Sequence, residues 1–224
     1  MEKGNLIVIE GACDGIGKTT QYQLLGKHLK DDGYDVVTHH FPSYGTPQGE
    51  LVTKYLRGEF GKPYDLSPYF INSLYAIDRA YTWYHDLKKE YEKGKTILLD
   101  RYTTSSLFYQ SCLIENYIDK KKFVDYVCEY EYEKLAIEEP DLVVFLHAPF
   151  DLVTKFRNQR KQNEGVLNDI HESNIDYMRH VYDNAMFMAD YLGWDMIQCN
   201  DNNQMRDIAD IHEDIYKLVK VKKM

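Results

Sequence analysis

The stretch IEGACDGIGKTTQ (Ile9–Gln21) carries the clearest structural signal in this 224-residue chain. It follows the apolar run NLIVIE (5–10), which is typical of a buried strand, and it leads into Leu24, Leu25 and Leu29, which lie at helical spacing. A glycine-rich turn between a strand and a helix, ending in Gly-Lys-Thr, is typical of a phosphate-binding loop. Successive backbone N–H groups of such a loop surround phosphate oxygens, and the helix start adds the positive end of its dipole. The stretch therefore predicts an α/β protein that binds ATP.

The spacing within this loop departs from the usual pattern. Seven steps separate Gly11 from Lys18, whereas the pattern G-x-x-x-x-G-K-[ST] has six, so the pattern is met only if Ala12 takes the first position. Either Gly11 precedes the loop, or the loop bulges at Ala12–Cys13. Cys13 beside a helix start could have a lowered thiol pKa, but we favour its interpretation as a small loop filler.

Lys18 and Thr19 have the roles that such loops assign to these residue types. Lys18 is expected to reach the outer phosphates, and the Thr19 hydroxyl is expected to ligate Mg²⁺. The predicted ATP-binding residues are Ala12, Cys13, Asp14, Gly15, Ile16, Gly17, Lys18, Thr19 and Thr20.

Composition and charge exclude several classes of protein. The 27 basic and 36 acidic residues give a formal net charge of -9, which argues against nonspecific nucleic-acid binding. The four cysteines show no C-x-x-C pair or metal-like spacing, so a reducing compartment is the default expectation. No stretch has the length of a membrane span, and the first apolar run is too short for a signal peptide. We expect a soluble, cytoplasmic protein.

Five short apolar runs predict the sheet: 5–10, 34–41, 95–100, 141–147 and 194–199. They are rich in Val, Ile and Leu and mostly do not alternate, as in parallel strands buried on both faces. Helical periodicity fills the gaps, and Met205 to Leu218 would form one face of a last helix. We predict a single domain over 1–224 with a doubly wound five-stranded parallel sheet. The polar segment 157–172 is the candidate for a mobile lid.

A second group of polar residues follows the predicted strand 95–100. In open α/β sheets, ligands bind beyond the carboxyl ends of the strands, where Asp100 and Arg101 stand. Asp100 could hold Mg²⁺ through water, and Arg101 could clamp a phosphate with two parallel hydrogen bonds. The alternative is an aspartate that caps the next helix and an arginine that pairs with it. The neighbouring phosphate loop favours the functional interpretation.

The segment NSLYAIDRAY (72–81) is helical by pattern and places Asn72, Tyr75 and Arg79 on one face. An aromatic ring with an arginine one turn away can stack on a nucleobase and bond to its edge. The alternative is a core tyrosine and a solvated arginine. Three further candidates for base and sugar contacts, or for ordinary helix packing, are Ser105, Ser106 and Tyr109.

Taken together, these residues resemble the thymidylate kinase family. The matching segments occur in order: EGACDGIGKTTQ, FPSYG, LYAIDRAY, LLDRYTTSS, and a basic segment followed by DIHE. They extend over nearly the whole chain. The resemblance implies the nucleoside monophosphate kinase fold, a homodimer, and transfer of the γ-phosphate of ATP to dTMP.

The resemblance also implies roles for individual residues. Asp14 would contact the acceptor sugar or its metal, Tyr75 would stack on thymine, and Arg79 would read thymine O4. Tyr44 occupies a position that touches the acceptor phosphate and is arginine in many members. Ser106 would contact the base, and Tyr109 would disfavour a 2′-hydroxyl. The implied dTMP-binding residues are Asp14, Phe41, Pro42, Tyr44, Tyr75, Arg79, Arg101, Ser105, Ser106 and Tyr109.

Some members of the family carry a catalytic arginine inside the phosphate loop, where this chain has Gly15. The chain thus resembles the members that use basic lid residues, for which Arg157, Arg160 and Lys161 are the candidates. The alternative for these three is a solvated charge run. The predicted catalytic residues are Lys18, Arg101, Asp14, Arg157 and Arg160.

The chemistry of the acceptor separates the candidate functions. A nucleotide phosphate has a second pKa of about 6, so it is already a nucleophile at neutral pH and needs cations rather than a base. A nucleoside kinase would need a carboxylate after the second strand, where this chain has HHFPSYG and no acid before Glu50. His39 and His40 are adjacent on a strand and point to opposite faces, so we reject joint metal binding. We predict a Mg²⁺- and ATP-dependent thymidylate kinase. A kinase for another nucleoside monophosphate or a deoxynucleoside, and an ATP-binding relative without turnover, remain open.

Overall fold

The computed structural model describes residues 3–164 and 174–223, and of residues 159–164 it describes the backbone only. Its main sheet has five parallel strands in the order β2-β3-β1-β4-β5. The strands are β1 (Leu6–Gly11), β2 (Val36–His40), β3 (Thr96–Asp100), β4 (Leu142–His147) and β5 (Asp195–Gln198). The predicted fold class is confirmed, and each strand lies within a predicted run or extends one residue beyond it.

The central strand β1 shows why the apolar runs do not alternate with polar residues. All six of its residues are buried. Leu6 and Val8 pack into a cluster with Trp83, while Ile7 and Ile9 pack into a cluster with Leu25 on the other side. Because each face of the sheet is covered, both sets of side chains must be apolar.

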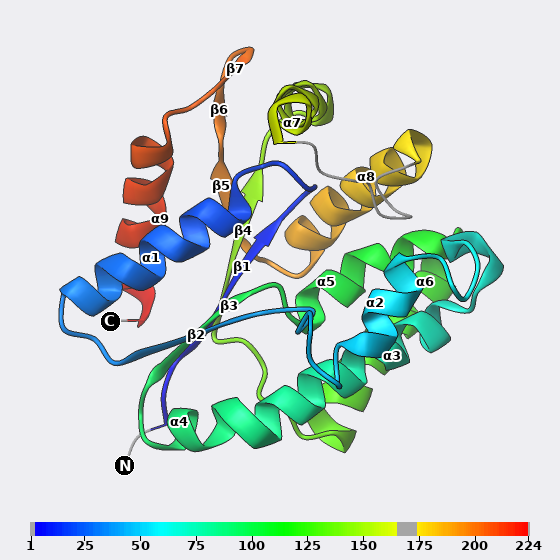
Figure 1. The fold of residues 1–224 in the computed structure, drawn as a ribbon, viewed down its shortest axis with the longest axis horizontal. Coiled ribbons are helices and arrows are strands. Elements are labelled where there is room, and N and C mark those ends of the chain that lie inside the picture. The colour runs from blue at the N-terminus through cyan, green and yellow to red at the C-terminus, as the bar shows by residue number, and fades with distance from the viewer. Residues whose placement is uncertain (1–2, 165–173, 224) are drawn as a thin grey trace.

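Helices cover the sheet on both sides (Figure 1). Helices α1 (Lys18–Asp31) and α9 (Ile208–Lys223) pack against each other and against the sheet. A π-helical stretch, η2 (Trp83–Leu87), and α4 (Lys88–Glu92) pack on the opposite face. The remaining helices are α2 (Glu50–Leu56), α3 (Pro68–Thr82), α5 (Thr103–Tyr109), α6 (Tyr117–Cys128), α7 (Phe150–Glu164) and α8 (Ile175–Tyr191), with short helical stretches η1 (Pro63–Asp65), η3 (Ser111–Leu113) and η4 (Glu129–Lys134).

The last helix begins later than its apolar periodicity predicts. Met205 belongs to β7 (Gln204–Met205), which pairs antiparallel with β6 (Asn200–Asp201), and α9 starts at Ile208. The turn between these strands holds Asn202 at φ 50°, a left-handed conformation that asparagine tolerates. The placement of Met205 in the helix was therefore wrong, because a tight turn separates it from the residues that share its spacing.

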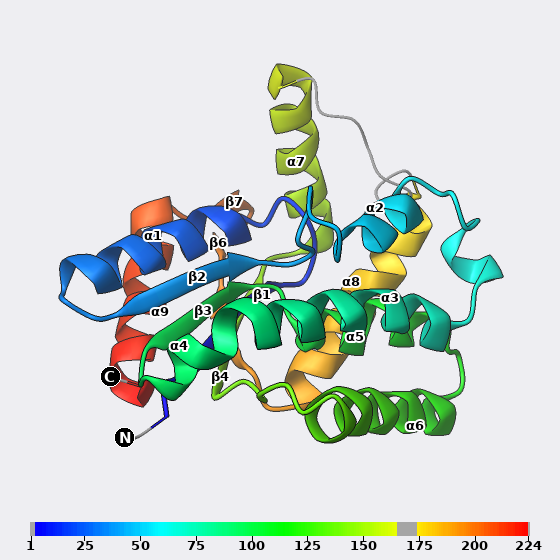
Figure 2. The same ribbon diagram turned by 60° about the horizontal axis from the view of Figure 1, so that its bottom comes forward.

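The predicted lid segment 157–172 is described only in part. Residues 157–164 continue α7, which stands out from the body of the molecule (Figure 2). Residues 165–172 lie outside the described residues, so the lid stays a prediction. Across the described helices, none combines the length and the apolar character needed to cross a membrane.

Candidate active site

The phosphate loop starts at Ala12. Gly11 is the last residue of β1, where it pairs with Leu146, and the Ala12 N–H donates to the Leu146 carbonyl at 3.0 Å. A Cβ on Gly11 would lie 2.7 Å from Cγ2 of Ile16, so a larger residue there would force Ile16 to shift. Of the two alternatives, the structure has Gly11 preceding the loop, which then runs from Ala12 into α1.

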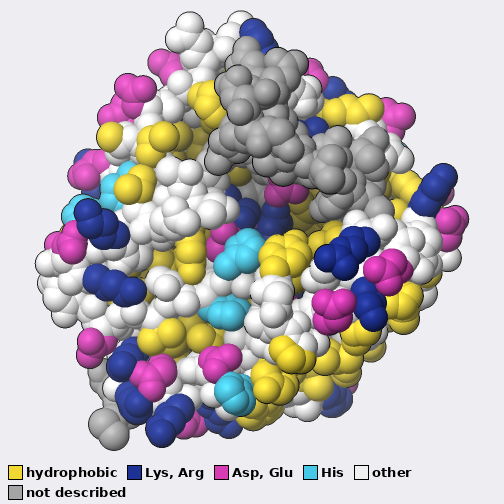
Figure 3. Space-filling view, viewed as in Figure 1, with side chains coloured by type: hydrophobic (Ala, Val, Ile, Leu, Met, Phe, Trp, Pro, Cys, Tyr) yellow, Lys and Arg dark blue, Asp and Glu magenta, His cyan; other side chains and the backbone are white. Residues whose placement is uncertain are grey.

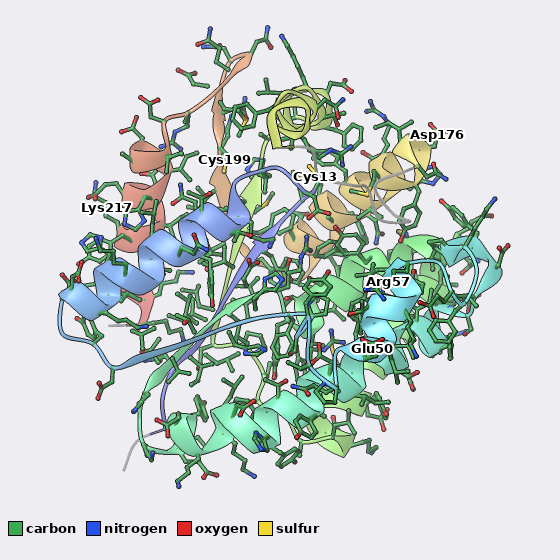
Figure 4. All side chains as sticks on the ribbon, in the orientation of Figure 1. Cys13, Glu50, Arg57, Asp176, Cys199 and Lys217 are labelled. Atoms are coloured by element: carbon green, nitrogen blue, oxygen red, sulfur yellow. The ribbon has the colours of Figure 1, made fainter. Side chains whose placement is uncertain are left out.

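Cys13 is a small residue inside the phosphate loop. Cys13 is only 3% exposed, and burial raises its thiol pKa to about 12, with a further rise from Asp14. The hypothesis of a lowered thiol pKa is therefore wrong, and Cys13 fills space in the loop. All four cysteines are free; Cys13 lies in the phosphate loop and Cys199 lies between β5 and β6 (Figure 4).

Lys18 and Asp100 meet where β1 and β3 end. The Lys18 ammonium donates to Asp100 Oδ1, and the Thr19 hydroxyl donates to Asp100 Oδ2 at 3.0 Å. Burial by itself would raise the pKa of Asp100, but the hydrogen bond from His40 and the Lys18 charge outweigh it and hold that pKa well below its ordinary value. Burial lowers the pKa of Lys18, and nearby Arg101 lowers it further. The two residues form a buried ion pair.

His40 is a site residue that the sequence reasoning missed. Its Nδ1 lies 3.0 Å from Asp100 Oδ2, while His39 Nε2 lies 3.0 Å from the Ser43 hydroxyl. The two rings thus point to opposite faces, as predicted. The signal for His40 was present in the strand register, because β2 and β3 place it directly beside Asp100.

Arg101 lies between two carboxylates beyond the end of β3. Its backbone is left-handed, with φ 68°, and its guanidinium contacts Asp14 and lies 3.9 Å from a carboxylate oxygen of Glu10. The ring of Tyr109 is 5.4 Å from the guanidinium carbon. Burial would lower the pKa of Arg101, but the surrounding negative groups raise it well above its ordinary value. The predicted residues Asp14, Arg101 and Tyr109 therefore come together.

Glu10 also escaped the sequence reasoning. It is fully buried, and the hydroxyls of Thr104 and Ser105 donate to its Oε1 at 2.8 and 2.6 Å. Its position as the fifth residue of a buried strand offered no signal of a polar role. Its contacts attach the end of β1 to α5, directly beside Arg101.

The segment after β2 lies against α3. Phe41 is buried and is joined to Pro42 by a cis peptide bond. The next residue, Ser43, donates its backbone N–H to Asp78 at 2.8 Å, which ties this segment to α3. Tyr44 is exposed, with its ring stacked 6.0 Å from that of His40.

Arg79 is not solvated, so that part of the alternative interpretation is wrong. It is 2% exposed and forms two hydrogen bonds to Glu131, from Nε at 2.6 Å and from a terminal nitrogen at 2.7 Å. Its guanidinium carbon lies 5.9 Å from the ring of Tyr75, and it donates to the Ser106 hydroxyl at 2.9 Å. The candidate base-binding residues thus form one cluster, together with a glutamate that the sequence did not reveal.

Arg157 lies against the phosphate loop. A Cβ on Gly15 would be 2.8 Å from Cβ of Arg157, and Arg157 Nε is buried without a hydrogen-bond partner among the described residues. This contact argues against the solvated charge run for Arg157. The side chains of Arg160 and Lys161 lie outside the described residues. In the space-filling view, basic and histidine side chains gather in and beside a hollow of this face (Figure 3).

Comparisons with known proteins identify the family of this chain. A model of the family described as "Thymidylate kinase" matches residues 9–215. The probable thymidylate kinase of Thermococcus gammatolerans is 31% identical over 220 residues, covering 96% of each chain. The thymidylate kinase of Plasmodium falciparum is 29% identical over 220 residues, covering 97% of this chain and 90% of that protein.

A solved structure shares the fold. The thymidylate kinase of Candida albicans superposes with a TM-score of 0.74 over 99% of this chain and 93% of that one, at 19% identity. The family model spans the loop, Arg101 and the Arg79 cluster. The chain belongs to the thymidylate kinase family, the nucleoside monophosphate kinases that phosphorylate dTMP with ATP.

Proposed function

We propose that this chain, as a single domain over 1–224, transfers the γ-phosphate of ATP to dTMP. The observation that carries the proposal is the convergence of two cationic groups at neighbouring strand ends. Lys18 serves the donor phosphates from the loop after β1, and Arg101 serves the acceptor phosphate from the end of β3. Cations beside the donor and acceptor phosphates offset the repulsion between these two anions and align them for in-line attack. Positioning and charge stabilisation of this kind are the main contributions of a protein to phosphoryl transfer.

The acceptor is a phosphate rather than a hydroxyl. The segment from His39 to Gly49 contains no acidic residue, and Glu50 begins α2 as an exposed side chain. Of the two carboxylates that the Arg101 guanidinium faces, Glu10 is buried and accepts two hydroxyl hydrogen bonds at Oε1, and Asp14 is paired with the guanidinium itself. A general base for a sugar hydroxyl therefore has no support here, whereas an ionised phosphate needs none.

Mg²⁺ is the cofactor that the residues fit. The Thr19 hydroxyl and the Asp100 carboxylate lie side by side, 3.0 Å apart, and hard oxygen donors of this kind suit Mg²⁺. These two residues would hold the ion, Asp100 through water, together with the nucleotide phosphates. When bound, Mg²⁺ neutralises charge on the transferring phosphoryl group.

Arg157 supplies further positive charge from α7. Its side chain packs on Gly15, and its buried Nε has a donor to offer to an ATP phosphate. Arg160 and Lys161 follow Arg157 along the same helix, and in this proposal they also offer positive charge to the ATP phosphates.

The enzyme acts as a homodimer through one side of α3. Exposed apolar side chains recur along this helix and the π-helical stretch after it, at helical spacing: Phe70, Ile77, Tyr81 and Tyr84. We call this set the α3 stripe. Exposed apolar side chains gathered on one side of a helix mark a protein–protein contact in this proposal. Light scattering coupled to size exclusion should give a dimer for the wild type and a monomer for Ile77→Glu. Tyr191→Glu, on the exposed side of α8, is the matched control and should stay dimeric.

The cell compartment follows from chemistry rather than from geometry. Four free cysteines and a nucleotide substrate fit the reducing cytoplasm, where we place the enzyme.

The test of the function is ADP release from ATP and Mg²⁺ with dTMP, dUMP, dCMP, dGMP, AMP and thymidine as separate acceptors. Strongest release with dTMP is expected, and Arg101→Ala should abolish most of it while the variant stays folded. Release with thymidine but not dTMP would make the chain a nucleoside kinase. ATP binding without release for any acceptor would make it a nucleotide-binding relative without turnover.

A further inference from the structure

Glu131 is the acidic partner at the centre of the Arg79 cluster. It lies on the π-helical stretch η4, 52 residues from Arg79 in the chain, and its side chain is fully buried. Both carboxylate oxygens accept from Arg79, and the Thr103 hydroxyl donates to Oε2 at 2.8 Å. A guanidinium held by two parallel hydrogen bonds has its plane and orientation fixed.

The remaining donors of Arg79 can be accounted for. The terminal nitrogen NH2 donates one hydrogen to Glu131 and shares its other hydrogen between the Ser106 hydroxyl at 2.9 Å and the Asn72 amide oxygen at 3.3 Å. The other terminal nitrogen, NH1, has one partner within the described part of the chain, the Tyr102 carbonyl at 3.4 Å. Hydrogen-bonding capacity therefore remains at NH1, on a guanidinium whose carbon lies 5.9 Å from the centroid of the Tyr75 ring.

This arrangement sets the polarity of its neighbours. A guanidinium can only donate, so the Ser106 hydroxyl and the Asn72 oxygen must accept from Arg79. The Ser106 O–H and the Asn72 amide nitrogen then remain as donors, and that amide nitrogen is buried with no partner among the described residues. Three groups of one cluster thus present donors. A ring carbonyl of a base can accept hydrogen bonds from these donors. An exocyclic amino group is itself a donor and cannot accept them.

We propose that Glu131 is a positioning residue for acceptor recognition: it orients Arg79 so that Arg79, Ser106 and Asn72 present donors, which selects a base with a carbonyl over one with an amino group at that edge. The inference rests on the proposed function, in which this cluster binds the base. It adds a residue that does not itself touch the acceptor.

The test compares dTMP with dCMP, which carries an amino group in place of the O4 carbonyl. Steady-state kcat and KM are measured at saturating ATP and Mg²⁺ for the wild type, Glu131→Gln and Thr103→Val. Glu133→Gln is the matched control, because it makes the same change at an exposed position of the same helical stretch. Circular dichroism at the assay temperature shows which variants are folded.

Glu131→Gln should lower the ratio of kcat/KM for dTMP over dCMP by about ten-fold or more, mainly through a higher KM for dTMP. Thr103→Val, which removes one hydrogen bond to the carboxylate, should lower the ratio in the same direction by a few-fold. Glu133→Gln should leave the ratio unchanged.

A folded Glu131→Gln with the wild-type ratio would overturn the inference. If that variant does not fold, an unchanged ratio in Thr103→Val overturns it instead. A wild-type protein that phosphorylates no nucleotide would refute the proposed function and the inference with it, whereas normal dTMP turnover with unchanged ratios refutes the inference alone.

Discussion

Replacing Asp100 by asparagine should strongly destabilise the protein in the absence of nucleotide. Asp100 has no solvent exposure and accepts from the Lys18 ammonium, the Thr19 hydroxyl and His40. Asp100→Asn keeps the shape but leaves the buried Lys18 charge facing a neutral amide. Breaking a buried ion pair on one side typically costs about 3–5 kcal/mol. At about 2–4 °C per kcal/mol for a chain of this size, the melting temperature should fall by roughly 6–20 °C.

The assay is thermal unfolding followed by circular dichroism, without ATP or Mg²⁺. Asp195→Asn is the matched control. It breaks the ion pair between Asp195 and Lys222, whose charged atoms are 2.6 Å apart and whose side chains are partly exposed. A surface pair is worth about 0–1 kcal/mol, so the control should melt within a few degrees of the wild type. Lys18→Met combined with Asp100→Asn removes the stranded charge and should melt above Asp100→Asn alone. If Asp100→Asn melts with the control, the ion pair does not contribute as argued.

The same pair has a pH signature whose sign follows from the depressed pKa of Asp100. A carboxylate with a folded-state pKa below its ordinary 3.8 stabilises the fold at pH values above 3.8, and this stabilisation is lost as the pH falls through the folded-state value. The difference in melting temperature between wild type and Asp100→Asn should therefore shrink in acid below about pH 4. A difference that grew in acid would contradict the assignment.

Two further predictions concern the phosphate loop. Gly15 and Gly17 have φ values of 92° and 95°, so alanine at either should cost about 1–2 kcal/mol by chemical denaturation. Gly15→Ala should also lower kcat, because its Cβ would displace Arg157, whereas a Cβ on Gly17 meets no heavy atom within 4 Å. If the kcat losses of Gly15→Ala and Arg157→Ala were additive in a double variant as stable as the single variants, that contact would be contradicted. Cys13, with a pKa of about 12, should alkylate with iodoacetamide far more slowly in the native protein than in urea, as peptide mass spectrometry would show.

Much of the fold could be predicted because its signals are local in the chain. Buried parallel strands need apolar residues on both faces, so runs such as 95–100 stand out without knowledge of their neighbours. The phosphate loop could be recognised because its glycines, lysine and threonine act through their own backbone and the helix that follows. Even the contact between His40 and Asp100 follows from strand register once the sheet order is known.

The partners of buried charges could not be predicted in the same way. Glu131 lies in EYEYEK, a segment that looks like any exposed acidic stretch, and only the packing of η4 against α3 and α5 makes it the partner of Arg79. Glu10 lies in an otherwise apolar strand, and its carboxylate has hydrogen-bond partners only because α5 places two hydroxyls beside it. For Met205 the local pattern itself misled. Its spacing matched the last helix, but the residue lies in a strand that a tight turn pairs with β6.

The doubly wound sheet, the nucleotide loop and the family could all be predicted from sequence patterns, because these features depend on residues close together in the chain. Which buried charges are in contact depends instead on the packing of segments that are remote in the chain. Lys18 and Asp100 are 82 residues apart and Arg79 and Glu131 are 52 residues apart, yet each pair is in direct contact. Hydrogen bonds and ion pairs require separations of a few ångströms in space, and no local pattern encodes such a distance between remote segments.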